Sequence, residues 1–313
     1  MSLVSEDFGL EILGLLLGVL QGLFEWLPVS SEGQLVIFLT KLVNADPNIA
    51  TTLALFAHIG TAFVVLLYFR EDYWRMIEAL VYYGRSLVDK QDRDDQIKEE
   101  DLRLARNVFL TTLATVPVAL VMLVIFEELV EELSSTLPLS VSDVVTIMVG
   151  LFLIATGLIL RSRPSLDQEL SSLTLFEHLS WKQAILLGLL QGLAALPGIS
   201  RSGITVTYLL VGSKLDQHES LRGSFLVAMP VSLGAGFLQV VRQKVIFMPG
   251  GIADADSTVV MTYFGGLMMM GAAFVVGGLT LKGFLDLAKK IPFDLFMFFF
   301  GAIAVVAGLF GLM

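Results

Sequence analysis

Long apolar runs dominate the chain, and six of them reach the length that a membrane-spanning helix needs. A helix crosses the hydrocarbon core with roughly 20 mostly apolar residues. The six runs lie at about 50–69, 104–126, 141–160, 220–241, 257–278 and 293–313. The pattern predicts an all-α integral membrane protein that crosses the membrane several times as one polytopic domain, 1–313.

Two further apolar regions, at about 9–43 and 182–213, are interrupted. Each begins as a helix, breaks at Pro28 or Pro197, and continues through small and polar residues into a second short apolar run. Because neither half is long enough to cross alone, each region predicts a re-entrant broken-helix hairpin. Irregular backbone at membrane depth is stable only where protein or a wet cavity surrounds it.

The two interrupted regions resemble each other. Segment 15–34 aligns with 185–204 when one gap is placed just before the prolines. The matched pairs include Gly18 with Gly188 and Gln21 with Gln191. Three spans follow each copy, and an odd number turns the second copy upside down. The sequence therefore predicts two inverted-topology repeats, about 9–160 and 182–313, with a site between their broken segments.

Loop charges orient this arrangement. Segment 70–103 carries seven Lys or Arg residues, whereas 127–140 carries none and has four glutamates. The positive-inside rule places the first in the cytoplasm and the second outside, although Arg242 and Lys244 run against the trend. The first hairpin then enters from outside and the second from the cytoplasm, so that their tips meet. The charged stretch 89–101 is expected to be solvated.

Composition agrees with a membrane protein. The chain is 55% hydrophobic and 16% charged, with a mean hydropathy of +0.79, against about 45–50% and about 25% in soluble domains. The lack of cysteine excludes disulfides and thiolate chemistry, and a net charge of −10 gives no reason to expect nucleic acid as a partner. Acidic residues before the first apolar run argue against a signal peptide, so we expect the N-terminus to be retained.

The first tip carries candidate chemistry. Gln21 and Glu25 are four residues apart and share one helix face. A buried glutamate in lipid is costly and by default functional, unless it only pairs with a basic residue that pins the hairpin. Ser30 and Ser31 are candidate nucleophiles, or simple N-caps of a helix that we expect to begin at Gln34.

The second tip carries a single arginine, Arg201, among serines and glycines. Ser200, Ser202 and the backbone N–H groups of the following helix predict an anion site, and Gly203 lets the backbone approach a ligand. The planar guanidinium suits phosphate oxygens. Alternatively, Arg201 pairs with Glu25 and only holds the repeats together, and the two functions are compatible.

Together these residues suit hydrolysis of a phosphate ester at a membrane, where positioning and charge neutralisation dominate the chemistry. Apolar walls would hold a lipid tail. A lipid-phosphate transporter that binds the head group without cleaving it is the alternative, because broken helices at the midplane are also typical of transporters.

Two segments, EWLPVSSEGQ (25–34) and PGISRSG (197–203), resemble the signature segments of the undecaprenyl-diphosphate phosphatase family, the bacitracin-resistance membrane proteins. Segments 58–69 and 225–236 resemble the helices that follow them. The similarity covers most of the chain and is weakest at 84–103. It implies removal of the terminal phosphate from a polyprenyl diphosphate, giving the monophosphate carrier lipid, at the plasma membrane.

Carried over residue by residue, the resemblance implies that Ser31 attacks phosphorus, that Glu25 is a base or a metal ligand, and that Arg201 stabilises charge. Ser30, Ser200, Ser202, Gly203 and Thr205 fill the remaining motif positions expected to bind phosphate. A divalent cation, Mg²⁺ or Ca²⁺, would bind Glu25 and substrate oxygens. A homodimer stays open, because small-residue patterns such as Gly265–Gly266 pack within or between chains.

Two positions depart from the family pattern: its histidine is Gln34 here, and Gln21 replaces a glutamate. Gln cannot carry a proton near neutral pH, whereas His can. Glu32 or His58 are the candidate substitutes, although a lone histidine on such a helix is more often a structural hydrogen-bonding group. Gln21 and its repeat Gln191 are assigned supporting roles.

Overall fold

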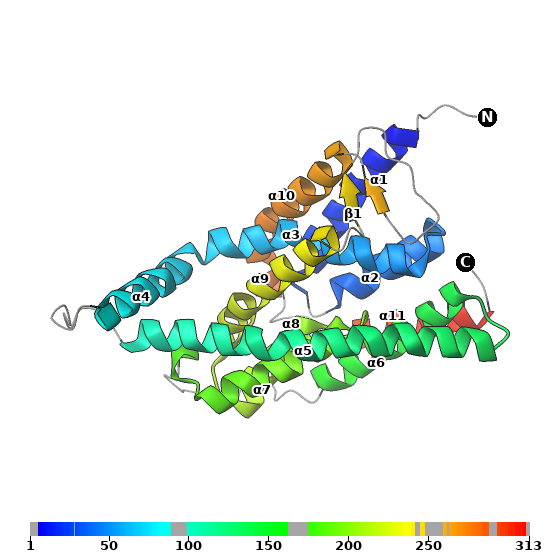
Figure 1. Cartoon of the computed structure of the whole chain (residues 1–313). Coiled ribbons are helices and arrows are strands. Elements are labelled where there is room, and N and C mark those ends of the chain that lie inside the picture. Colours follow the sequence, from blue (N-terminus) through cyan, green and yellow to red (C-terminus); the bar gives the residue numbers. More distant parts are fainter. Residues whose placement is uncertain are drawn as a thin grey trace.

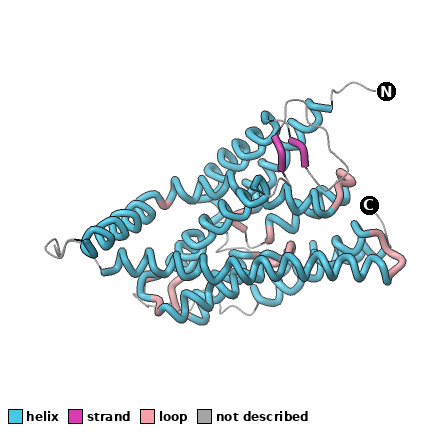
Figure 2. The backbone as a smooth tube through the Cα atoms, viewed as in Figure 1, coloured by secondary structure: helices cyan, strands magenta, loops and turns pink. Residues whose placement is uncertain are grey.

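The computed structural model describes residues 6–27, 29–88, 99–161, 175–241, 245–247, 259–261, 263–287 and 293–310. In these residues the chain is helical apart from one pair of short parallel strands (Figures 1 and 2). The elements are α1 (Glu6–Phe24), α2 (Ser31–Ile37), η1 (Phe38–Leu42), α3 (Pro47–Tyr68), α4 (Arg70–Val88), α5 (Glu99–Thr136), α6 (Val141–Arg161), η2 (Phe176–His178), α7 (Trp181–Gly192), η3 (Leu193–Ala195), α8 (Arg201–Thr207), η4 (Tyr208–Gly212), α9 (Gln217–Val241), β1 (Val245–Phe247), β2 (Val259–Met261), α10 (Tyr263–Leu287) and α11 (Phe293–Phe310).

Five of the described helices are long and apolar enough to cross a membrane: α3, α5, α6, α9 and α10. They correspond to five of the six predicted spans. The sixth, 293–313, contains the shorter apolar helix α11. The chain is therefore an all-helical, multi-pass membrane protein, as its apolar pattern predicted.

The region between the first two spans differs from the prediction. We expected 70–103 to be a charged loop, but 70–88 is helix α4 and α5 already begins at Glu99. Likewise, α5 runs on to Thr136 through the acidic segment expected to be an external loop. The physical reason is that Glu and Leu are good helix formers, so that the helix continues until the chain approaches Pro138. Residues 89–98, Arg242 and Lys244 lie outside the described residues.

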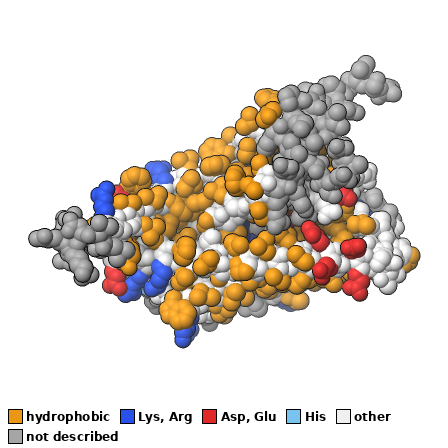
Figure 3. All heavy atoms as spheres, viewed as in Figure 1, with side chains coloured by type: hydrophobic (Ala, Val, Ile, Leu, Met, Phe, Trp, Pro, Cys, Tyr) orange, Lys and Arg blue, Asp and Glu red, His pale blue; other side chains and the backbone are white. Residues whose placement is uncertain are grey.

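Charge is distributed unevenly along the molecule. In Figure 3 basic side chains gather at the end formed by α4 and the start of α5, and a group of acidic side chains lies towards the opposite end, over the end of α5. Hydrophobic side chains cover the surface between them. This asymmetry is the one from which the sequence predicted the orientation.

Small residues allow the helices to pack closely. Helix α1 packs on α10, α7 on α5, α3 on α9, and α6 on α11. Where α6 crosses α11, a Cβ atom on Gly150 would lie only 2.8 Å from the carbonyl oxygen of Gly301, which shows how near the backbones are. Gly265 lies against Gly14 of α1, so its small-residue surface is used within the chain.

The two broken segments share one local design. Ser30 and Ser200 are the N-caps of α2 and α8, and their Oγ atoms accept hydrogen bonds from the third residue on, Gly33 N at 3.3 Å and Gly203 N at 3.1 Å. Each seven-residue α-helix then continues into a five-residue π-helix, η1 or η4. The helix after the first break thus begins at Ser31, and the prediction that it begins at Gln34 was wrong. The cause is the cap: the Ser30 hydroxyl accepts a hydrogen bond from the Gly33 N–H, so the helix begins directly after Ser30.

The two tips also touch each other. The backbone N–H of Gly198 donates to Ser30 Oγ at 3.1 Å, and a Cβ atom on Gly33 would lie 2.8 Å from Gly198 Cα. Gly198 has a φ of +104°, in the left-handed region that glycine adopts without strain. This contact fixes the side chains of one tip relative to those of the other.

Candidate active site

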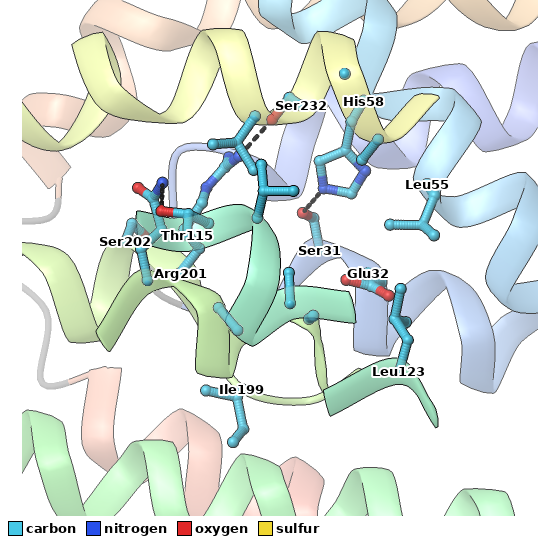
Figure 4. Close-up of a pocket in the computed structure, with 18 of the residues that line it drawn as sticks. Ser31, Glu32, Leu55, His58, Thr115, Leu123, Ile199, Arg201, Ser202 and Ser232 are labelled. Atoms are coloured by element: carbon cyan, nitrogen blue, oxygen red, sulfur yellow. Dashed lines mark hydrogen bonds between the residues drawn. The ribbon is translucent and has the colours of Figure 1, made fainter. Parts of the chain in front are cut away.

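A cavity of about 380 Å³ lies where the two tips meet α3, α5 and α9 (Figure 4). Polar side chains from both tips line one part of it. Its remaining walls are mostly apolar and come largely from α5 and α9. The lining includes Glu25, Ser30, Ser31, Glu32, His58, Thr115, Gln191, Ser200, Arg201, Ser202, Ser232, Leu55, Val116, Leu120, Leu123, Ile199 and Leu238.

An ion pair joins the tips. The guanidinium of Arg201 donates to Glu25 Oε1 and also to Ser232 Oγ on α9. Glu25 is 7% exposed, whereas 20% of the Arg201 side chain is accessible. The ion pair that the sequence left open as an alternative is therefore present, and Arg201 still lines the cavity.

Ser31 lies beside this pair. Its hydroxyl donates to Glu25 Oε2 at 2.8 Å, and Gln21 Nε2 donates to the same oxygen at 2.7 Å. Because Ser31 is the first residue of α2, the cap at Ser30 determines where its side chain points. The carboxylate of Glu25 thus accepts hydrogen bonds from both tips and from its own helix.

His58 on α3 completes the cluster. Its Nε2 lies 3.4 Å from Ser31 Oγ and 3.3 Å from Glu25 Oε2 (Figure 4). Its Nδ1 lies 2.7 Å from the carbonyl oxygen of Ala54, one turn earlier. His58 therefore makes the structural hydrogen bond expected of a lone histidine, and its other nitrogen faces the candidate nucleophile.

Not every predicted site residue reaches the cavity. Gln21, Gln34, Gly203 and Thr205 do not line it. Gln34 Nε2 donates to the Val29 carbonyl at 3.4 Å, and Thr205 Oγ1 donates to the Arg201 carbonyl at 2.8 Å. Both side chains therefore stabilise the local backbone.

The two serines of the second tip make different contacts. Ser200 Oγ is occupied by the capping bond and lies 3.3 Å from Ser202 Oγ. Ser202 also lines the cavity, next to Arg201. Gln191, the repeat of Gln21, lines it as well and donates to Thr115 Oγ1 on α5 at 3.1 Å.

Glu32 is buried at the cavity without a counter-charge in contact. It is 8% exposed, and its Oε1 has no hydrogen-bond partner. Among the described residues at the cavity it is thus distinct from Glu25, which is satisfied on both oxygens.

Two cavity residues escaped the sequence analysis. Ser232 holds Arg201 from α9, and Thr115 holds Gln191 from α5. Both are isolated hydroxyls within apolar runs, and that is the signal that marks them. Hydroxyl residues are common in membrane helices for packing alone, so the signal does not separate them from the rest.

The described residues form no cage of protein ligands for a metal ion, and a cation held by Glu25 with substrate oxygens stays a prediction. In the described part of the chain, no three His, Asp or Glu side chains form a group able to hold one. Glu25, the predicted ligand, already accepts hydrogen bonds on both oxygens. The reaction proposed for this chain gives no step to a cation.

Comparison with known proteins gives a consistent result. A family model described as "Bacitracin resistance protein BacA" matches residues 14–306. A protein of Haloarcula marismortui named undecaprenyl-diphosphatase is 33% identical, over 95% of this chain and 97% of its own length. Proteins of the same name from Methanothrix thermoacetophila and Methanobrevibacter smithii are 30% and 33% identical, with coverage of at least 93% of each chain.

Proposed function

Because the chain belongs to the bacitracin resistance protein BacA family, we propose that it is a polyprenyl-diphosphate phosphatase that removes the terminal phosphate from an undecaprenyl-type diphosphate. The product is the monophosphate carrier lipid. One observation carries the proposal: a nucleophile, a carboxylate and an arginine from segments far apart in the sequence converge on one cavity with apolar walls. The names of the relatives support the same substrate class.

In the proposed reaction Arg201 binds the terminal phosphate. Its guanidinium reaches the cavity and offers a planar set of donors. When phosphate arrives, it competes with Glu25 for these donors. Glu25 keeps its hydrogen bond with Ser31. The phosphate that Arg201 binds therefore lies close to the hydroxyl that attacks it.

Ser31 is the proposed nucleophile. Its Oγ forms a bond to the terminal phosphorus, and the bridging P–O bond breaks to release the monophosphate lipid. Water then hydrolyses the phosphoserine and frees inorganic phosphate. A serine hydroxyl reacts only when a base takes its proton. Ser202 Oγ contacts Ser200 Oγ and the Leu27 carbonyl, and among the described residues it contacts no carboxylate.

The apolar walls provide the place for the polyprenyl chain. Leu120 and Leu123 of α5 and Leu238 of α9 line the cavity away from the ion pair. An apolar chain lying along them leaves only the diphosphate at the polar tips. The terminal phosphate is thereby presented to Ser31 while the lipid stays in the membrane.

We further propose that the chain forms two inverted repeats with re-entrant hairpins in a single domain. The matched caps and π-helices of the two broken segments support this, as does the reciprocal packing of α1 on α10 and α7 on α5. The charge asymmetry supports a first tip entered from outside and a second entered from the cytoplasm. The plasma membrane is the expected location, and homodimer formation remains a prediction.

The test is phosphate release from farnesyl and longer polyprenyl diphosphates by detergent-purified protein, beside the Arg201→Ala and Glu25→Ala variants. We expect release by the wild type and loss of at least about 100-fold in each variant. The same assay with and without EDTA examines the predicted cation. Lack of release from every polyprenyl diphosphate, with or without divalent cations, would sink the proposal.

The transporter alternative is tested on the same preparations. A head-group carrier needs the arginine but has no use for a nucleophile, so Ser31→Ala should leave its lipid movement intact. Reconstituted vesicles that move polyprenyl phosphate faster than empty vesicles, without cleavage, would favour transport. The contact between Ser31 and two proton acceptors favours hydrolysis.

A further inference from the structure

The proposed reaction needs a group that takes the proton of Ser31, and position 34 does not provide one. The Gln34 amide donates to the Val29 carbonyl and does not line the cavity. An amide also has no basic nitrogen near neutral pH. The proton acceptor must therefore be found elsewhere among the groups around Ser31 Oγ.

Two groups lie within reach of that oxygen. Glu25 Oε2 is 2.8 Å away and His58 Nε2 is 3.4 Å away. Glu25 already accepts hydrogen bonds from Arg201 on one oxygen and from Gln21 on the other. An imidazole is also the more basic of the two in ordinary peptides, by about two pKa units.

The orientation of His58 suits a base. A carbonyl oxygen is only an acceptor, so the 2.7 Å contact between Nδ1 and the Ala54 carbonyl requires a proton on Nδ1. In the neutral ring Nε2 then carries the lone pair, and this is the nitrogen that faces Ser31 (Figure 4). The tautomer needed for proton transfer is thus fixed by the backbone of α3.

We infer that His58 is the catalytic base of this chain and accepts the Ser31 proton as Oγ attacks the terminal phosphorus. This inference rests on the proposed phosphatase function and adds a residue to it. In the first step the Oγ–P bond forms, the bridging P–O bond breaks, and the proton moves to His58 Nε2. In the second step water bonds to phosphorus, Oγ leaves with one of the water's protons, and the imidazolium gives its own proton to solvent.

A carboxylate lies beside the nitrogen that receives the proton. Glu25 Oε2 lies 3.3 Å from Nε2 and stabilises an imidazolium by charge. Arg201, the cation of the site, is then occupied by phosphate. Glu32 also lines the cavity, so Glu25, Glu32 and Arg201 are the ionisable side chains that share it with His58 among the described residues. In a serine–histidine–acid triad the carboxylate holds Nδ1; here the Ala54 carbonyl takes that place, and Glu25 lies beside Nε2.

The chain contains a matched control. Of its three histidines, His178 lies in η2, and the His218 side chain at the start of α9 is 87% exposed. Neither lines the cavity. His58→Asn keeps an amide able to donate to the Ala54 carbonyl while it removes the basic nitrogen, and His218→Asn makes the same chemical change on the surface.

The experiment compares kcat and KM for polyprenyl diphosphate among wild type, His58→Asn, His218→Asn, Ser31→Ala and the Ser31→Ala/His58→Asn double variant. Binding of a non-hydrolysable methylene-bridged polyprenyl diphosphate analogue checks that each variant is folded. We expect His58→Asn to lower kcat by at least about 100-fold, with KM and analogue binding within about threefold of wild type. His218→Asn should match the wild type, and the double variant should be no slower than Ser31→Ala.

The outcomes separate the two claims. A wild type that binds the analogue but releases no phosphate overturns the proposed function and with it this inference. An active wild type whose His58→Asn variant keeps kcat within about threefold overturns only the role of His58. A His58→Asn variant that loses analogue binding as well is compared with His58→Gln. If both variants lose binding while the Ser31→Ala variant retains it, His58 is structural and the inference fails.

Discussion

The two broken segments are capped in the same way but carry different side chains at the next position. Ser30 and Ser200 cap short helices in the same way, yet the next residue is a serine in one tip and an arginine in the other. Ser30 has a φ of 56°, whereas Ser200 is extended and the left-handed residue of its tip is Gly198. The comparison teaches that two similarly capped tips bring two positions together and place a hydroxyl at one and a cation at the other.

The largest effect is expected from removing the cation. Arg201→Ala removes the guanidinium group that is proposed to bind phosphate, and it leaves Glu25 buried without its partner. We expect phosphate release to fall by about 10³-fold or more and the free energy of unfolding to fall by about 3 kcal/mol. Arg201→Lys keeps the charge without the planar fork and should recover part of both, as initial rates and thermal unfolding in detergent would show.

Replacing one serine in each tip by alanine sharpens the comparison. Ser31→Ala should lower the rate of release by about 10³-fold, because no other hydroxyl contacts Glu25 and His58 among the described residues. Ser202→Ala should change it by no more than about fivefold, since Ser202 bonds only to Ser200 and a backbone carbonyl in the structure. Equal losses in both variants would show that the tips are chemically equivalent.

The close packing of Gly198 on α6 is expected to affect stability first. In Gly198→Ala the new Cβ would lie 2.6 Å from the Val149 carbonyl oxygen and 2.9 Å from Phe152 Cβ, at a φ of +104°. We expect a loss of about 2–3 kcal/mol in the free energy of unfolding. Gly234→Ala is the matched control, because nothing lies within 4 Å of its new Cβ. Similar thermal unfolding midpoints for the two variants would contradict the close approach of the second tip to α6.

A second ion cluster, outside the tips, should stabilise the fold and leave the chemistry unchanged. Arg222 binds Asp72 at 2.6 Å, Glu177 at 2.8 Å and Glu219 at 2.9 Å, and these bonds join α4, η2 and α9. Burial alone would raise the pKa of Glu177, but the hydrogen bonds and charge of Arg222 outweigh it and hold that pKa below its ordinary value of 4.5.

A depressed pKa in the folded state gives stability that is present above the unfolded value and is lost as pH falls through the folded value. The wild type should therefore unfold at a higher temperature than Glu177→Gln at pH 6–7, and the gap should shrink as pH falls below about 4.5. A gap that stays constant from pH 7 down to about pH 2 would show that Glu177 contributes through packing alone. Phosphate release at pH 7 by the folded variant should match the wild type.

The helices and their two breaks follow from the sequence, because apolar length and proline act locally. The helical course of 127–136 was missed because its four glutamates resemble a loop, although glutamate is also a strong helix former. The pair Glu25–Arg201 was foreseen as one of two readings, since a buried charge needs a partner. His58 was named as a candidate substitute for the family histidine. Its contact with Ser31 Oγ could not be derived from the sequence, because it depends on how η1 and the left-handed Asn44 turn α3 back towards α2.

The most direct test of the central claim is to follow the terminal phosphate itself. Purified protein is mixed with a polyprenyl diphosphate labelled on that phosphate, quenched in acid within one turnover, and digested to locate the label. The account predicts label on the peptide that contains Ser31, none in the Ser31→Ala or Arg201→Ala variants, and loss of phosphate release in both. A Ser31→Ala variant that releases phosphate at the wild-type rate, with no labelled peptide in either protein, would contradict a site built from the two tips around Ser31.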